Sequence, residues 1–392
     1  MLPPSTLLAA ALAAVAIVGG AVVLPAMGRV RRLRPAERRG PRRAGPTAAV
    51  VVAARDEADT IEPALHSLLA QTDDGVRVVV VDDRSTDGTT DILRRVARAH
   101  RELEVVRIDA LPPGWLGKNH ALDRGAKAAG DVDFLLFTDA DVVFEPGGVR
   151  AAIEHADREG LDHLTGAPRI RARSFALAGM IASFGVLFGL FTRPWRVRDP
   201  KSSAAVGIGA LNLVRRSAYV AAGGHRRIRM RIDDDLRLGR LIKESGGRSE
   251  FVFATDVASL EWYPSLGAMA RGLHKNAFAG IDFRLTIALA ATVFIVVVFI
   301  APFVLPFLGG LPLAARALAA AAAVAHVAGA AASARRAGLR MDAGLFFPLG
   351  LTVFLFVLWR SAVGALATRR VVWRDTAYPL RDLTDAARKE AA

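Results

Sequence analysis

Two carboxylates separated by one residue, Asp139 and Asp141, follow an apolar run at residues 134–138. Hard divalent cations such as Mg²⁺ and Mn²⁺ prefer carboxylate oxygens, and a cation held by one or two carboxylates keeps positions open for a diphosphate. A solvated turn is the alternative, because this spacing alone is common. The pair is therefore a candidate site for a metal ion and a diphosphate.

A second acidic pair, Asp82 and Asp83, ends a Val-rich run at residues 76–81. A carboxylate at the end of a strand can accept a hydrogen bond from a nucleobase N–H or a ribose hydroxyl. Alternatively, Asp82 and Asp87 cap the helix that follows. Both interpretations hold if Asp87 is the cap and Asp83 contacts the ligand.

A lysine next to a glycine, Lys118, lies between these acidic pairs and before a predicted helix. It could meet a donor phosphate, or it is a surface lysine near a turn.

Three adjacent acids, Asp233, Asp234 and Asp235, open a predicted amphipathic helix that contains Leu238 and Leu241. Acids at a helix start compensate the helix dipole, which is one sufficient reason for their presence. Crowded carboxylates also raise one another's pKa, which suits a general base that deprotonates an acceptor hydroxyl. Composition alone leaves both interpretations open.

The elements that must position these residues alternate between apolar strands and amphipathic helices. Strands are predicted at residues 48–53, 76–81, 105–106 and 134–138, and helices at residues 61–69 and 89–99. This alternation predicts the α/β class with a doubly wound, mostly parallel sheet. In such a sheet the ligand binds beyond the carboxyl ends of the strands, where the acidic pairs lie.

Long apolar runs on both sides of this region predict membrane segments, in keeping with a content of 52% hydrophobic residues. We divide the chain into an N-terminal transmembrane anchor, a basic cytoplasmic linker, a catalytic domain, C-terminal membrane helices and a cytoplasmic or interfacial tail. The corresponding ranges are 1–28, 29–46, 47–284, 285–368 and 369–392. A cleaved signal peptide is the competing interpretation for the first run, but no positive charge precedes it.

Two other apolar stretches have more than one interpretation. We predict that residues 175–191 form a buried or membrane-surface helix, because a span would separate the motifs. The run at 344–367 contains Arg360, and a full span would place the following arginines outside, so a re-entrant segment is an alternative.

The net charge of +14 comes largely from arginines beside the apolar runs. Such flanks are typical of the cytoplasmic side of a membrane and of contact with anionic lipid, and no nucleic-acid motif accompanies them. We therefore expect a multi-pass protein of the cell (inner) membrane that does not bind nucleic acid. The absence of Cys excludes disulfides and thiolate metal sites.

The motifs, taken in order over about residues 47–280, resemble family 2 glycosyltransferases of the nucleotide-diphospho-sugar transferase A fold. They occupy residues 53–57, 81–89, 138–141 and 234–238. The resemblance implies a nucleotide-sugar donor, with UDP as the expected carrier, and a Mg²⁺ or Mn²⁺ ion held by Asp139 and Asp141. It implies that Asp235 is the catalytic base, with Asp234 beside it in the catalytic motif. The implied donor-binding residues are Ala53, Arg55, Asp56, Glu57, Asp83, Lys118, Asp139 and Asp141.

The acceptor is expected to be a hydroxyl of a membrane lipid. The segments 114–122, 274–278 and 372–378 resemble the branch of the family that glycosylates carotenoids, hopanoids and related lipids. Family members commonly have Pro and Asn where this chain has Ala53 and Asp56. Processive members carry a Gln-x-x-Arg-Trp motif after the base, whereas residues 271–276 of this chain read Arg-Gly-Leu-His-Lys-Asn. We therefore expect an inverting transfer of one sugar, with a processive polysaccharide synthase as the alternative.

Overall fold

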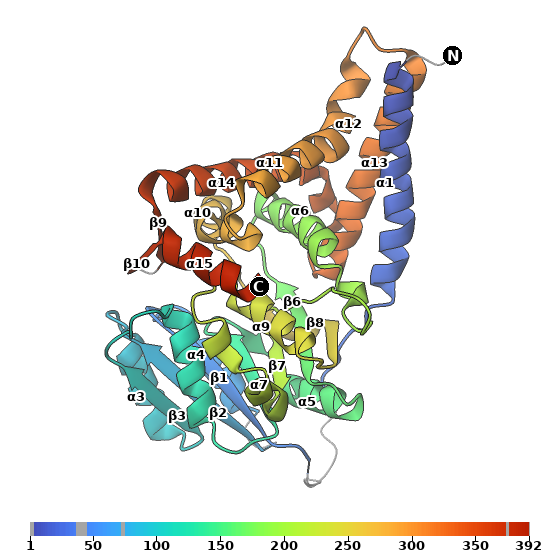
Figure 1. Ribbon diagram of the computed structural model, residues 1–392. Coiled ribbons are helices and arrows are strands. Elements are labelled where there is room, and N and C mark those ends of the chain that lie inside the picture. The colour runs from blue at the N-terminus through green and yellow to red at the C-terminus, as the bar shows by residue number, and fades with distance from the viewer. Residues whose placement is uncertain (1–3, 37–44, 72–74, 374–375, 392) are drawn as a thin grey trace. The chain divides into compact units, whose positions relative to one another are not determined.

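The computed structural model describes residues 4–36, 45–71, 75–373 and 376–391. The chain divides into two compact units (Figure 1). The sheet unit comprises Val30–Arg171, Thr192–Glu261 and Asp385–Ala392, and the helical unit comprises Met1–Arg29, Ala172–Phe191 and Trp262–Thr384. Segments 172–191 and 262–284, which we assigned to the catalytic domain, group with the helical unit in this division.

The sheet unit contains an eight-stranded sheet in the order β3-β2-β1-β4-β7-β6-β8-β5. Its strands are β1 (Ala48–Ala54), β2 (Val76–Asp83), β3 (Leu103–Ile108), β4 (Phe134–Asp139), β5 (Val143–Phe144), β6 (His163–Ile170), β7 (Asn212–Arg215) and β8 (Ser249–Leu260). The first four are parallel, β7 is antiparallel to both its neighbours, β6 and β8 are parallel, and β5 is antiparallel to β8. The predicted mostly parallel sheet is confirmed.

Helices cover this sheet, and the longer ones present an apolar stripe to it. They are α2 (Ile61–Leu69), α3 (Thr89–Ala99), α4 (Gly117–Ala128), α5 (Gly148–Arg158), α7 (Arg216–Ala221), α8 (Gly224–Arg227) and α9 (Asp234–Glu244). In α3, for example, Leu93 and Val96 are buried one turn apart. Strands β1 and β2 are buried along almost their whole length, as expected for central parallel strands.

The first part of the predicted basic linker is held against the edge of β8. Leu33 N donates to Phe253 O, and Phe253 N donates to Arg31 O, both at 2.8 Å. Arg32 also pairs with Asp256 at 3.4 Å. These bonds protect part of the strand edge from other pairing partners. Residues 37–44 of the predicted linker lie outside the described residues.

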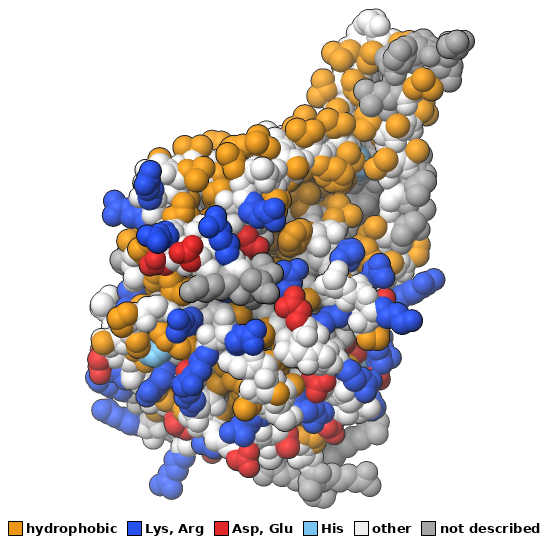
Figure 2. Space-filling model, in the orientation of Figure 1, with side chains coloured by type: hydrophobic (Ala, Val, Ile, Leu, Met, Phe, Trp, Pro, Cys, Tyr) orange, Lys and Arg blue, Asp and Glu red, His pale blue; other side chains and the backbone are white. Residues whose placement is uncertain are grey.

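The helical unit contains four helices, within the described residues, that are long and apolar enough to cross a membrane. They are Phe175–Arg196, Leu285–Phe307, Leu313–Arg336 and Met341–Thr368. Hydrophobic side chains cover much of the visible surface of this unit (Figure 2). The unit also contains α1 (Pro4–Gly28), α10 (Leu266–Ala277) and a hairpin of β9 (Arg370–Trp373) and β10 (Thr376–Pro379). The division between the two units falls within the last helix, α15 (Leu380–Ala391). Association with a membrane is the direct implication of the four apolar helices.

Two predictions about these helices remain predictions. The stretch at 175–191 forms α6 (Phe175–Thr192), which is partly buried within the helical unit but is also long enough to span a bilayer. The last apolar run forms one continuous helix, α14 (Phe347–Thr368). Length and composition do not separate a span from a re-entrant segment.

A proline explains the irregular middle of the second apolar run. The helix α11 (Leu285–Phe294) passes through a π-helical turn, Ile295–Ile300, before α12 (Ala301–Val304). Pro302 has no N–H for the carbonyl of Val298, four residues earlier. The imidazole Nε2 of His326, from α13 (Leu313–Arg336), lies 2.9 Å from that oxygen and supplies the missing donor. A backbone group that an apolar surrounding would leave unsatisfied is thereby paired.

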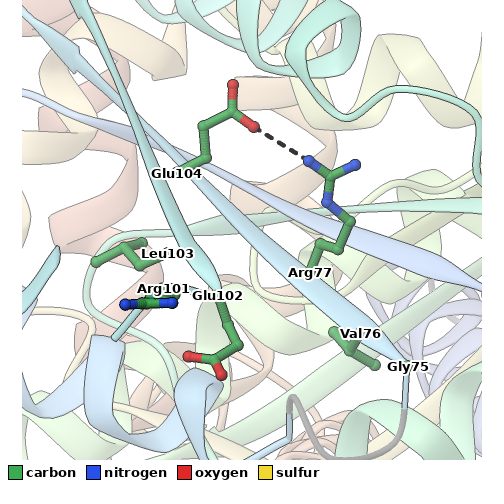
Figure 3. Close-up of a pocket in the computed structure, with 7 residues that line it drawn as sticks. All are labelled: Gly75, Val76, Arg77, Arg101, Glu102, Leu103 and Glu104. Carbon is green, nitrogen blue, oxygen red and sulfur yellow. Dashed lines mark hydrogen bonds and ion pairs between the residues drawn. The ribbon is translucent and has the colours of Figure 1, made fainter. Parts of the chain in front are cut away.

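The sheet unit has a hollow at the amino ends of β2 and β3 (Figure 3). Its lining residues are Gly75, Val76, Arg77, Arg101, Glu102, Leu103 and Glu104. Arg77 and Glu104 pair across it at 3.3 Å. Because ligands of such sheets bind at the carboxyl ends of the strands, this hollow lies at the wrong edge for the predicted site.

Candidate functional site

Strand register brings the predicted donor residues together at the carboxyl edge of the sheet. Ala53 of β1 is opposite Val81 of β2 on one side and Asp139 of β4 on the other. Asp82 is opposite Ala54, so Asp83 ends β2 at the same level. The backbone of Ala53 thus lies between the two strand ends that carry the acids.

The carboxylate of Asp83 is held by its neighbour in the chain. Arg84 Nε lies 2.8 Å from Asp83 Oδ1, and Arg84 Nη2 lies 2.9 Å from Oδ2. A Cβ on Gly117 would lie 2.4 Å from Asp83 Oδ2 and 2.9 Å from Arg84 Nη2. The first residue of α4 therefore rests directly on this ion pair, and glycine is required there for room.

The other two acids of this motif have structural partners. Asp82 accepts from Ser85 N at 3.1 Å and pairs with Arg107 at 2.7 Å. Asp87 accepts from Thr89 N at 2.9 Å and from Ala58 N. Asp87 lies one residue before the N-cap of α3, which is Gly88, and holds the first N–H of the helix, while Asp83 lies at the carboxyl edge of the sheet.

The loop after β1 is tied to the loop after β2. Asp56 Oδ1 accepts from Thr86 N at 2.8 Å, and Glu57 N donates to Thr89 Oγ1 at 2.8 Å. Arg55 Nε lies 3.7 Å from Asp56 Oδ2. Asp56 has φ 52° and Arg84 has φ 60°, a region that non-glycine residues rarely adopt. Such backbone strain clusters at ligand sites, and here it marks both loops.

Lys118 links the two remaining acidic clusters. Its Nζ lies 2.8 Å from Asp139 Oδ1 and 3.3 Å from Asp234 Oδ2. Burial alone would lower the pKa of Lys118, but the charges of Asp139, Asp234 and Asp235 outweigh burial and raise it well above its ordinary value. Lys118 is therefore a permanent cation at the centre of the site.

Asp235 is joined to Asp139 through a residue that the sequence motifs do not contain, Gly209. Gly209 N donates to Asp235 Oδ2 at 2.8 Å, while Gly209 O accepts from Asp139 N at 2.9 Å. A Cβ on Gly209 would lie 2.5 Å from Asp139 Oδ2. One glycine backbone thus sets the position of both acids.

The loop that carries Gly209 is fixed by two buried threonines. Thr138 Oγ1 donates to Ala210 O at 2.9 Å, and Thr165 Oγ1 accepts from Ile208 N at 2.8 Å. The adjacent Asn212 donates to Asp235 O at 3.3 Å. A stretch of small residues is the only sequence signal for this loop, and it does not indicate the partners.

The three adjacent acids have three separate roles. Asp233 pairs with Arg231 at 3.2 Å and Arg237 at 2.8 Å, so it is structural. Asp234 contacts Lys118, and Asp235 contacts the Gly209 loop. Helix-dipole compensation does not distinguish these three positions, whereas the contacts do.

Burial, together with the negative charge of neighbouring acids, raises two pKa values at this edge. Burial, then the charges of Asp139 and Glu57, raise the pKa of Asp141 to about 7. Burial, then the charge of Asp234, raise the pKa of Asp235 to about 7, and Lys118 opposes this shift. A divalent cation between Asp139 and Asp141 would relieve the first shift, so these residues fit Mg²⁺ or Mn²⁺. Within the described residues no group of three His, Asp or Glu side chains forms a complete metal cage.

Comparison with known proteins identifies the fold and finds a family match for part of the chain. A mannosyltransferase from Pyrobaculum calidifontis, solved in complex with GDP-Man and Mn²⁺, superposes with a TM-score of 0.53 over 93% of this chain and 99% of that chain, at 19% identity. The sheet therefore has the A fold of glycosyltransferases. Residues 49–220 match the model of Glycosyl transferase family 2.

The matched residues are thus similar to a family 2 glycosyltransferase domain. The chain is 28% identical over 191 residues to the 4,4'-diaponeurosporenoate glycosyltransferase of Staphylococcus aureus (strain USA300), which is 48% of this chain and 49% of the relative. Proteins of the same name from other Staphylococcus aureus strains match equally. The chain spans about half the length of the curated relatives that it matches.

Proposed function

We propose that the protein is an inverting glycosyltransferase that moves one sugar from a UDP-linked donor to a hydroxyl of a membrane lipid. The observation that carries this proposal is the convergence of Asp139, Lys118, Asp234 and Asp235 around Gly209. In this proposal Asp235 is the base, and Lys118 and Asp139 lie at the diphosphate site next to it. The lipid acceptor is supported by the apolar helices and by the carotenoid-type name of the Staphylococcus aureus relative.

In the proposed reaction, the carboxylate of Asp235 accepts the proton of the acceptor hydroxyl. The oxygen forms a bond to the anomeric carbon as the bond from that carbon to the diphosphate oxygen breaks, which inverts the centre. Lys118 offers its ammonium to the departing diphosphate, and Asp234 orients that ammonium. When bound at Asp139 and Asp141, Mg²⁺ or Mn²⁺ would neutralise charge on the diphosphate.

Membrane association, which the apolar helices support, would bring this chemistry to a lipid surface. The basic residues after α1 favour a cytoplasmic face for the sheet unit, because cytoplasmic flanks carry excess Lys and Arg. We extend the proposal to a multi-pass protein of the cell (inner) membrane whose sheet unit faces the cytoplasm.

The experiment is a transfer assay with the purified full chain in detergent. It contains Mn²⁺, mixed bacterial membrane lipids and a panel of nucleotide sugars labelled in the sugar, with a chelator control. We expect label in the lipid phase as one sugar per acceptor from UDP donors, and none with the chelator. Long labelled chains would instead support a polysaccharide synthase. No consumption of any donor would overturn the proposal.

The activity should depend on pH through Asp235. Its carboxyl acts as a base only when deprotonated, and its pKa is raised to about 7 by burial and Asp234. Below this value kcat/KM should therefore fall about tenfold per pH unit, and above it the profile should be flat. Removing the negative charge in Asp234→Asn should lower the pKa of Asp235 and move the acid limb to lower pH. A limb that moves to higher pH, or stays in place, would contradict the assignment of Asp235 as the titrating base.

A further inference from the structure

Two buried polar side chains, His163 of β6 and Asn212 of β7, lie on the face of the sheet that α9 covers. Each is 1% exposed. In the antiparallel pairing of the two strands Thr165 is opposite Asn212, so the side chains of His163 and Asn212 share one face. A Cβ on Gly239 of α9 would lie 2.9 Å from His163 Cε1. The second turn of this helix therefore rests on the imidazole.

Two hydrogen bonds in series lead from His163 to Asp235. His163 Nε2 lies 2.6 Å from Asn212 Oδ1, and Asn212 Nδ2 donates to Asp235 O at 3.3 Å. A carbonyl oxygen can only accept, so the Asn212 amide turns its nitrogen to Asp235 and its oxygen to His163. The imidazole must then carry its proton on Nε2. His163 thus fixes the orientation of the Asn212 amide.

The protonation state of His163 does not change near neutral pH. Burial lowers the pKa of His163 to about 4, although the hydrogen bond to Asn212 opposes this shift. Its Nδ1 atom is buried and has no partner among the described residues. A buried N–H without an acceptor is costly, which agrees with a neutral ring that is protonated at Nε2. The donor to Asn212 is therefore present throughout the neutral pH range.

The carboxylate of Asp235 depends on the position of its own backbone. Its Oδ1 accepts from Leu236 N at 2.7 Å, and its Oδ2 accepts from Gly209 N at 2.8 Å. A Cβ on Gly207 would lie 1.7 Å from Asp235 O, so this carbonyl lies against the Gly207 backbone as well as the Asn212 amide. A shift of the first turn of α9 would move the carboxylate relative to Gly209.

We propose that His163 and Asn212 are positioning residues, which hold the backbone of Asp235 so that its carboxylate stays in place for proton transfer. This inference rests on the proposed function, in which Asp235 is the base. Because the two side chains act through the backbone of the base, their removal should affect the chemical step and not the affinity for the donor. A displacement of about 1 Å can cost about 100-fold in rate.

The test measures kcat and the KM for labelled donor in variants of the purified full chain. His163→Leu removes the N–H and should lower kcat at least about tenfold, while the KM changes by no more than about twofold. His163→Gln retains a side-chain N–H and should restore most of kcat. Combining His163→Leu with Asn212→Leu leaves neither partner unsatisfied, so the thermal unfolding midpoint should exceed that of His163→Leu alone. The kcat of this double variant should nevertheless stay low, because the donor to Asp235 O is still absent.

His155 offers a matched control in the same unit. It is also buried, with 7% exposed, and its Nε2 lies 3.1 Å from Glu250 Oε2 instead of a residue that holds Asp235. His155→Leu should lower the thermal unfolding midpoint but keep kcat within about twofold of wild type. A loss of kcat as large as that of His163→Leu would show a general effect of removing a buried histidine, and it would overturn the inference.

A double-mutant cycle with Asp235→Asn separates positioning of the base from a general structural effect. If His163 acts through the base, His163→Leu should lower kcat by less than about twofold once Asp235 is Asn. An equal loss in both backgrounds, or wild-type kcat in the double variant of His163 and Asn212, would overturn the inference while the proposed function stands. If Asp235→Asn itself keeps wild-type kcat, the base of the proposed function fails together with the inference.

Discussion

The variant Asp235→Asn is expected to lose transfer activity by a factor of about 10³, within the range for removal of a general base. The amide cannot take the proton of the acceptor hydroxyl at neutral pH. Its oxygen can still accept from Gly209 N, which now binds Asp235 Oδ2 at 2.8 Å. Donor binding should therefore change by no more than about threefold, since the base acts only in the chemical step. The measurements are kcat with labelled donor and the affinity for UDP with Mn²⁺.

The control for this variant is the acid two positions earlier. Asp233→Asn removes the same charge from the same helix start, but its carboxylate contacts Arg231 and Arg237 and not the Gly209 loop. It should lower stability, because it removes the Asp233 carboxylate from two buried arginines, and it should keep kcat within about tenfold of wild type. Equal losses of kcat in both variants would mean that activity depends on the negative charge at the helix start and not on proton transfer to Asp235.

The first half of the sheet could be predicted from the sequence because its strands are strongly apolar and β-branched. The predicted strands at 48–53, 76–81 and 134–138 correspond to β1, β2 and β4, each extended by one or two residues. Strands β6, β7 and β8 were not predicted. Strand β7 has only four residues, Asn212–Arg215, and β6 contains Gly166 and Pro168. Neither gives a clear strand signal, because short strands and strands with Gly or Pro depart from the usual pattern.

The candidate site, like the sheet, could be predicted from the sequence only in part. Local sequence predicted that the acids after β2 and β4 lie at one edge, because parallel strands bring their carboxyl ends together. It could not predict which of the acids Asp233 to Asp235 faces that edge, since the answer depends on contacts with distant residues. Lys118 contacts Asp234 from more than a hundred positions away in the sequence. Gly209 contacts Asp235 from about twenty-five positions away. Long-range contacts of a glycine backbone leave no side-chain signal in one sequence.

Gly209→Ala is the second variant for which we expect a large loss of activity, although it changes no charged residue. The added Cβ would lie 2.5 Å from Asp139 Oδ2, closer than real Cβ contacts, and 3.1 Å from its Cγ, which is also tight. The Asp139 side chain is 39% exposed, so it can rotate away with little cost in stability. That rotation would move it off Lys118 and out of the candidate metal site. We expect kcat/KM to fall at least about 100-fold, the scale for a displacement of about 1 Å, with a higher requirement for Mn²⁺.

Variants of two other glycines are controls that separate displacement of the Asp139 side chain from a general steric effect of an added Cβ. A Cβ on Gly207 would lie 1.7 Å from Asp235 O, a backbone atom that cannot rotate away, so Gly207→Ala should impair folding. A Cβ on Gly88 would lie 3.7 Å from Ala58, an ordinary contact, so Gly88→Ala should keep activity close to wild type. The thermal unfolding midpoint and kcat/KM should therefore distinguish the three variants. Gly207→Ala should lose stability, Gly209→Ala should lose activity with little loss of stability, and Gly88→Ala should keep its activity. A Gly209→Ala protein with full activity would show that Asp139 need not occupy its present position, and the metal assignment would fall with it.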